Sequence, residues 1–104
     1  DFVEQCRQIA PLVSHIHLTD NFGKVQLDAH ADQSENLYAG LGDVHVLPGW
    51  GSIPFDELEK IPFPRQPIVN LELRPQFFEH LQLASDVTRS FAARIAQNAV
   101  VAAD

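Results

Sequence analysis

The chain has 104 residues, a length that predicts one domain or part of one. Its composition, 45% hydrophobic and 20% charged, excludes a disordered tail, a collagen-like repeat and a coiled coil. No apolar run approaches about 18 residues, so we expect no membrane-spanning helix. The net charge of −7, with only Lys24, Lys60 and five scattered arginines on the basic side, argues against a nucleic-acid partner.

The single cysteine, Cys6, excludes an internal disulfide framework and favours a reducing, cytoplasmic location. The first residues, DFVEQCRQIA, lack the basic start and apolar core of a secretory signal. The sequence contains no methionine. Two interpretations are open, a trimmed small protein or a chain whose upstream part is missing, and the element pattern favours the second.

Residues 2–10 predict a helix, and Pro11 ends it because the residue before a proline leaves the helical region. Residues 13–18 alternate as a strand. The helical stripe consists of Phe2, Cys6, Ile9 and Ala10. The strand carries Ile16 and Leu18 on one face and His15 and His17 on the other.

Residues 24–52 are polar and glycine-containing with no sustained period, which predicts a long loop that is functional or disordered. Residues 53–61 predict a short helix, with Ser52 as a possible N-cap and Pro54 near the first turn. Pro62 and the prolines after it stop this helix.

Residues 68–73 predict a second strand and residues 76–100 a long helix. The strand has an aliphatic face of Val69, Leu71 and Leu73 and a face of Ile68, Asn70, Glu72 and Arg74. The helical stripe, interpreted as core, consists of Phe77, Leu81, Ala84, Val87, Phe91, Ile95 and Ala99.

Strands that alternate with helices predict an α/β fold, here two parallel strands with flanking helices. Two parallel strands are too few to close a sheet, and their edges stay open. We therefore expect the apolar stripes to be completed by the remainder of a barrel or by other copies of the chain.

Each strand has one aliphatic face and one polar face, and each polar face ends near a loop. The polar face is either the exposed face of a small sheet or the mouth of a parallel barrel, where polar residues at the strand ends build the active site. Polar residues at the end of both strands favour the barrel.

His17, Asp43, His45 and Glu72 form a plausible metal-ligand set. Imidazole and carboxylate together suit Zn, Mn, Fe or Co better than Mg or Ca. Asp28 and His30 have the same spacing in the same loop and are a rival pair. A carboxylate between two leucines needs a partner or a metal if it is buried, and Arg74 is a candidate partner for Glu72.

The segments HIHLTDNFG at 15–23, DVHVLPGWGSIPFDEL at 43–58 and VNLELRP at 69–75 resemble the C-terminal part of the xylose-isomerase-like TIM barrels. The family holds sugar-phosphate isomerases and epimerases as well as the apurinic endonucleases. The resemblance implies that the chain is about the last quarter of a (β/α)8 barrel. It also implies a divalent metal, one of Mn, Zn, Co or Mg, and a small sugar or sugar phosphate as substrate.

The resemblance also implies roles for single residues. His17, Asp43, His45 and Glu72 stand at metal positions, and Glu72 is in addition the catalytic acid or base. The substrate-side residues would be His15, Asn21 and Arg74. Trp50 is either a sugar-stacking surface or a cover for the helix, and Lys24 or Arg74 would bind a phosphate if the substrate has one.

The loop from Lys24 to Gly42 is longer than the family pattern, so the assignment of its ligands has two solutions. Counting forward from His17 favours Asp28 and His30. Counting back from Gly49 favours the pair Asp43 and His45, which we prefer because the Gly-x-Gly spacing leaves less room to slip.

Three functions follow as hypotheses. The first is a metal-dependent isomerase or epimerase that works by proton transfer through an enediolate. The second is an apurinic-endonuclease-like phosphodiester hydrolase, which the low number of lysines disfavours. The third is a non-catalytic, self-associating barrel fragment; the 104-residue chain alone is expected to be inactive.

Overall fold

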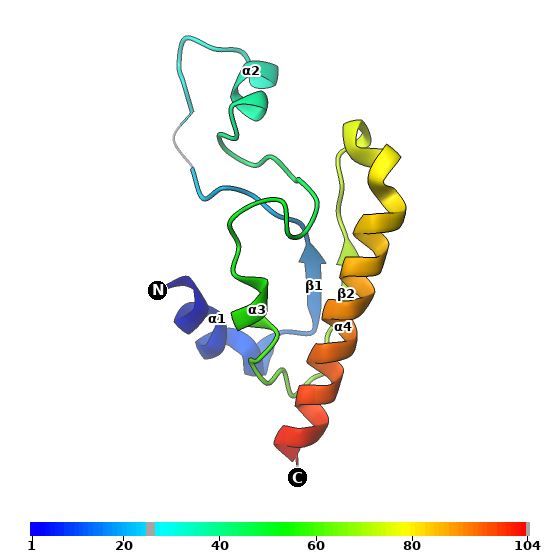
Figure 1. Cartoon of the computed structure of the whole chain (residues 1–104). Helices are drawn as coiled ribbons and strands as arrows, with labels where there is room; N and C mark the ends of the chain where they lie inside the picture. The colour runs from blue at the N-terminus through cyan, green and yellow to red at the C-terminus, as the bar shows by residue number, and fades with distance from the viewer. Residues whose placement is uncertain (25–26, 104) are drawn as a thin grey trace.

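The computed structural model describes residues 1–24 and 27–103, so residues 25 and 26 of the expected loop lie outside the described residues. The chain folds into two strands with helices before, between and after them (Figure 1). In chain order the elements are α1 (Phe2–Ile9), η1 (Ala10–Leu12), β1 (His15–Leu18), α2 (Gln33–Tyr38), α3 (Phe55–Leu58), β2 (Ile68–Leu71), η2 (Pro75–His80) and α4 (Leu81–Ala103).

β1 and β2 form a two-stranded parallel sheet, which confirms the predicted parallel pairing. His17 lies opposite Asn70 in the register, and Leu18 lies opposite Leu71. The ladder continues one residue past β2, because the Glu72 N–H donates to the Leu18 carbonyl at 2.8 Å. Glu72 is therefore held at the carboxyl end of the sheet, beside the end of β1.

The aliphatic face of the sheet packs into the hydrophobic core. Ile16, Leu18 and Val69 contact a cluster that α1, α3 and α4 complete. The buried members of this cluster are Ala10, Leu18, Leu58, Ile61, Phe63, Phe91 and Ile95. The opposite face carries His15, His17 and Asn70, all exposed. All three α-helices of the cluster thus cover one face of the sheet, and Figure 1 shows α4 lying along β2.

The loop expected over 24–52 contains a short helix, α2, that we did not predict. Its six residues have no apolar period, so the hydrophobic pattern does not predict a helix there. A capping signal was present: the Asp32 side chain accepts from the Glu35 N–H at 2.8 Å, at the spacing of a capping box. The buried Asn36 amide accepts from Asp28 N and donates to the Asp32 carbonyl, which ties α2 to its loop.

Two other helices differ from their predicted form. The N-cap of α3 is Pro54, without a side-chain cap, whereas Ser52 bonds instead to the Asn21 carbonyl. The long helix expected over 76–100 is divided, because residues from Pro75 to His80 form the 3-10 helix η2 and α4 begins only at Leu81.

Only part of the apolar stripe predicted on the first helix packs into the core. Cys6 and Ala10 pack against it, together with Val3, whereas Phe2 and Ile9 keep 50% and 55% of their exposure. These two side chains line a hollow of about 270 Å3 beside β1. The α1 stripe therefore faces the open edge of the sheet.

Candidate functional site

Glu72 is the centre of a group of polar side chains at the carboxyl ends of β1 and β2. Its Oε1 is hydrogen-bonded to His17 Nδ1, and its Oε2 lies 3.0 Å from His45 Nε2. His17 comes from β1, Glu72 from the end of β2 and His45 from the loop between α2 and α3. The tertiary structure thus brings three of the four expected metal ligands into direct contact.

The backbone of His45 adopts the left-handed conformation, with φ of 48°. A non-glycine residue in this region is uncommon and carries a conformational cost of about 1–3 kcal/mol, so the surrounding structure must hold it there. Its ring lies between two carboxylates, because Nδ1 is 2.5 Å from Asp43 Oδ1 while Nε2 faces Glu72. The Nδ1 contact lacks hydrogen-bond geometry, and this buried atom has no hydrogen-bond partner in the described part of the chain.

The two histidines change the acidity of Glu72. Hydrogen bonds from His45 and then from His17 lower the pKa of the Glu72 carboxyl below its ordinary value. Donors that bind the charged form of a carboxyl favour ionisation. Glu72 is therefore an anion at neutral pH, which is the form that binds a metal ion.

Arg74 is not the ion-pair partner of Glu72 that the sequence suggested. Its Nη2 donates to the carbonyl of Asp43 at 2.8 Å, and histidines take the place beside Glu72. The guanidinium thereby anchors the loop residue next to His45. A hollow of about 440 Å3 opens over His45, Glu72 and Arg74.

His15 and Asn21, the other two expected substrate-side residues, lie in different places. The His15 ring lies on the polar face, bonded to Asn70 Nδ2 at 2.8 Å and edge-on to His17. The Asn21 side chain instead accepts from Gly23 N at 2.8 Å, which makes it part of the turn that follows β1. It therefore holds the chain reversal and does not belong to the group around Glu72.

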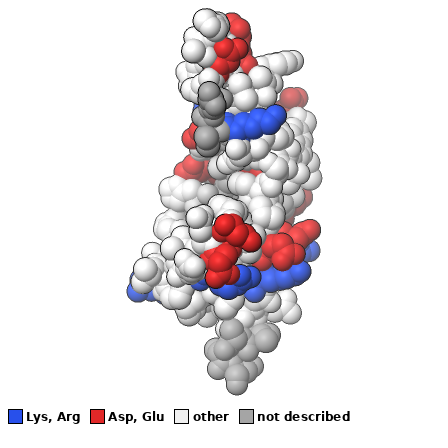
Figure 2. Space-filling view, turned by 90° about the vertical axis from the view of Figure 1, so that its left-hand side faces the viewer, with Lys and Arg blue, Asp and Glu red and all other residues white. Residues whose placement is uncertain are grey.

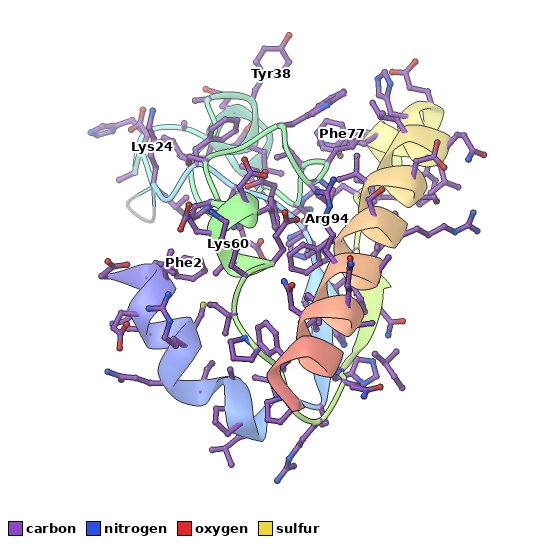
Figure 3. The ribbon with its side chains drawn as sticks, turned by 60° about the horizontal axis from the view of Figure 1, so that its bottom comes forward. Phe2, Lys24, Tyr38, Lys60, Phe77 and Arg94 are labelled. Carbon is purple, nitrogen blue, oxygen red and sulfur yellow. The ribbon has the colours of Figure 1, made fainter. Side chains whose placement is uncertain are left out.

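Trp50 packs on the segment that follows β2. Its ring meets the His80 ring at a centroid distance of 4.9 Å and the Phe77 ring at 6.2 Å. Figure 3 shows Phe77 on the side of η2 that faces the loops. Trp50 is still 44% exposed, so one part of the ring covers η2 while the rest is open to solvent.

The structure brings His45, and not His30, to Glu72. Asp28 accepts from the backbone N–H of His30 at 2.9 Å and bonds to Asn36, in the part of the loop that carries α2. Lys24 is exposed in the same loop, and its carbonyl accepts from Gly42 N. Tyr38, at 98% exposure, points away from the molecule in this region (Figure 3).

One residue of the site region was missed. The sequence indicated no role for Asp20, which lies inside the segment HIHLTDNFG, yet this residue is fully buried at 0% exposure. Its carboxylate accepts four backbone N–H bonds, from Asn21, Gly49, Gly51 and Ile53, at 2.8–3.1 Å. An Asp two residues after a strand, with glycines in the loop further along the chain, was the available signal.

The donor set has the chemistry of a transition-metal site, two imidazoles and two carboxylates. Within residues 1–24 and 27–103, no three His, Cys, Asp or Glu side chains converge on one point that could hold a metal ion. The contacts are pairwise instead, with Glu72 bonded to each histidine. The buried, unpartnered Nδ1 of His45 beside the Asp43 carboxylate is the observation that fits a cation.

No family model matches this chain, and neither a curated protein nor a solved structure matches it significantly. None of the described helices has the length and apolar character needed to cross a membrane. On the face shown in Figure 2, basic side chains lie in separate places with acidic side chains near them, and they form no continuous patch. A functional assignment therefore depends on the geometry around Glu72.

Proposed function

We propose that this chain is part of a divalent-metal-dependent isomerase or epimerase that acts on a small sugar or sugar phosphate. The observation that carries the proposal is the Glu72 carboxylate, bonded to His17 and His45 at the carboxyl ends of two parallel strands. In parallel α/β folds, ligands bind at this end of the strands.

The architecture supports a sector of a barrel wall of the xylose-isomerase-like kind. The three core helices cover the aliphatic face of the sheet, and the polar face is exposed. In a (β/α)8 barrel the helices form the outer ring, and polar residues at the carboxyl ends of the strands build the site. A continuation of the sheet past both edges would place His17 and Glu72 inside such a barrel.

His17, Asp43, His45 and Glu72 would hold the metal, which is one of Mn, Zn, Co or Mg. When bound, the metal would polarise the carbonyl of the substrate. The Glu72 carboxylate would take the proton from the carbon beside that carbonyl, and the electrons of the broken C–H bond would form the enediolate. In isomerisation, Glu72 would return the proton to the neighbouring carbon while the hydroxyl proton moves to the former carbonyl oxygen. In epimerisation, Glu72 would keep the proton and a second acid, from the remainder of the barrel, would protonate the opposite face.

The lowered pKa of Glu72 favours its role as a ligand in the free protein, because a weakly basic carboxylate removes a carbon-bound proton slowly. A change of partner for His45 or His17 on substrate binding would raise the basicity of Glu72. Trp50 and Arg74 supply the remaining substrate contacts, stacking and anion binding, that suit a phosphorylated sugar.

The first prediction concerns Glu72→Gln, which removes the charge and keeps the shape. We expect the wild-type chain to bind Mn, Co or Zn, and the variant to bind at least about tenfold more weakly, as loss of even an outer-shell partner does. Isothermal titration with each metal measures this. Glu57→Gln, an equivalent change on the exposed face of α3, is the control and should leave the affinity unchanged.

Activity is tested separately by incubating metal-loaded protein with a panel of ketoses and their phosphates in D2O. Deuterium at the carbon beside the carbonyl, followed by proton NMR, reports proton abstraction whatever the product is. Because the 104-residue chain alone is expected to be inactive, metal binding decides the proposal, and a wild-type chain that binds none of the three metals would overturn it.

The open edge of the sheet is evidence for a partner that pairs with β1, either the remainder of a barrel or a second copy of the chain. Ile68 N donates to Ser14 O and Glu72 N donates to Leu18 O, so the alternate backbone groups of β1, at His15 and His17, point toward the unpaired edge. The apolar hollow beside this edge includes Phe2, Cys6 and Ile9. Burial raises the pKa of the Cys6 thiol, which keeps it protonated and weakly nucleophilic.

A further inference from the structure

Asp20 has no role in the proposed chemistry, yet it is the most completely buried charged residue in the described part of the chain, at 0% exposure. A buried carboxylate is costly unless its oxygens are fully hydrogen-bonded. Oδ2 accepts from the N–H groups of Gly49 and Gly51, and Oδ1 accepts from those of Asn21 and Ile53. One side chain thus fixes the loop between the site and α3.

The backbone of Asp20 makes a second connection. Its N–H donates to the Val46 carbonyl at 3.0 Å, and its carbonyl accepts from Val46 N at 3.1 Å. Val46 directly follows His45, which has the left-handed backbone. Asp20 therefore fixes the segment that follows His45 at two points. Its backbone bonds to Val46, and its side chain bonds to the turn at Gly49 and Gly51.

We propose that Asp20 is a positioning residue, which holds His45 in its left-handed conformation so that its ring reaches Glu72. Arg74 holds the other side of the same segment through the Asp43 carbonyl. The strain at His45 is offset by the hydrogen bonds that Asp20 collects. The Asp20 carboxylate accepts only from backbone N–H groups and from none of the expected metal ligands, and its effect on metal binding rests on the function proposed above.

Gly51 supplies an independent way to disturb the same contact. A Cβ at Gly51 would lie 2.5 Å from Asp20 Oδ1 and 2.3 Å from the Asn21 carbonyl, far inside contact distance. Gly51→Ala therefore displaces the carboxylate while Asp20 stays in the sequence. If Asp20 positions His45, then Asp20→Asn and Gly51→Ala must have the same effect on the His45 ring.

The test is NMR on the metal-free 104-residue chain, with the side chains of His45 and Glu72 assigned. In the wild type we expect cross-peaks between the His45 ring and the Glu72 side chain. In Asp20→Asn and Gly51→Ala these should be lost or fall severalfold, while the methyl signals of the core around Phe91 persist. Asp86→Asn, an exposed aspartate on α4, is the matched control and should change nothing.

Metal titration of the same variants separates this inference from the proposed function. If the wild type binds metal, both variants should bind roughly 10- to 100-fold more weakly, the range for residues that orient a ligand. If the wild type binds no metal, the proposed function fails while the NMR result still decides the role of Asp20. Unchanged His45 cross-peaks, or global unfolding of both variants, would overturn the positioning role.

Discussion

The Glu72 side chain keeps 37% of its exposure while both of its oxygens contact imidazoles. Solvent screens charges at such a position, so these contacts add little to folding stability. Their main consequence is chemical, because they hold Glu72 ionised and orient both rings. The buried Asp20 differs from Glu72, because its carboxylate accepts four backbone hydrogen bonds that are shielded from water.

At this scale the pKa of Glu72 is a direct test of the geometry. His45→Gln should raise that pKa toward its ordinary value of 4.5, and by more than His17→Gln does, because the His45 hydrogen bond is the larger cause. A carbon-detected NMR titration of the Glu72 carboxyl in each variant measures the order. An equal or reversed order would contradict the assigned contacts.

The sign of the accompanying stability change follows from the same shift. Because folding lowers the pKa of Glu72, its contribution is fully present above the unfolded value and is lost as pH falls through the folded pKa. The free energy of unfolding of the metal-free chain, measured with urea, should therefore fall from neutral to acidic pH by more in the wild type than in Glu72→Gln. Glu57→Gln should show the same fall as the wild type.

At the scale of elements, α4 connects the sheet to α3. Ala84, Phe91, Ile95 and Ala99 are buried at helical spacing. Arg94 pairs with Glu59 at 3.0 Å, and Asn98 Nδ2 donates to the Glu59 carbonyl. The aromatic ring of Phe91 stands edge-on to Phe55 at 5.6 Å, inside the core. The helix is thus fixed by packing first and by polar contacts at its rim.

Phe91→Ala should cost about 3–5 kcal/mol of unfolding free energy, because it removes a buried ring and leaves a cavity. Phe78→Ala is the control, since Phe78 is 55% exposed where Phe91 is 5% exposed. The control should change stability by no more than about 0.5 kcal/mol. Urea midpoints compare the two, and similar losses in both would show that the core is placed wrongly.

At the scale of the whole molecule, the chain is extended. Its radius of gyration is 15.0 Å and its extents are 53 × 31 × 19 Å. A compact domain of about 100 residues has a radius near 13 Å. The excess reflects a sheet with two open edges and a long loop at one end, as Figure 1 shows. Such a shape leaves apolar surface that association would bury.

We therefore expect the isolated chain to self-associate through the hollow beside β1. The double variant Phe2→Glu and Ile9→Glu places charge in that hollow and should shift the equilibrium toward monomer by at least about tenfold. Sedimentation across a concentration range measures this. Tyr38→Glu, at the far tip of the loop, is the control and should have no effect. A wild-type chain that stays monomeric at every concentration would contradict the prediction.

Periodicity and turn chemistry in the sequence by themselves determined the two strands, their alternating faces and the helices that flank them. His15 and His17 oppose Ile16 and Leu18 because side chains on a strand alternate with a period of two. The pairing of His17 with Glu72 could also be anticipated, since parallel strands bring their carboxyl ends together.

The sequence favoured His45 as the loop residue of the candidate site, but only the tertiary structure brought its ring to Glu72 and decided what holds it there. His30 and His45 share the Asp-x-His spacing, and in the sequence only the count back from the Gly-x-Gly after His45 favours the second pair. The choice depends on hydrogen bonds between residues about thirty positions apart, such as Asp20 with Gly49 and Gly51. A local pattern cannot encode such contacts, because their free energy exists only after the sheet and the loop have come together.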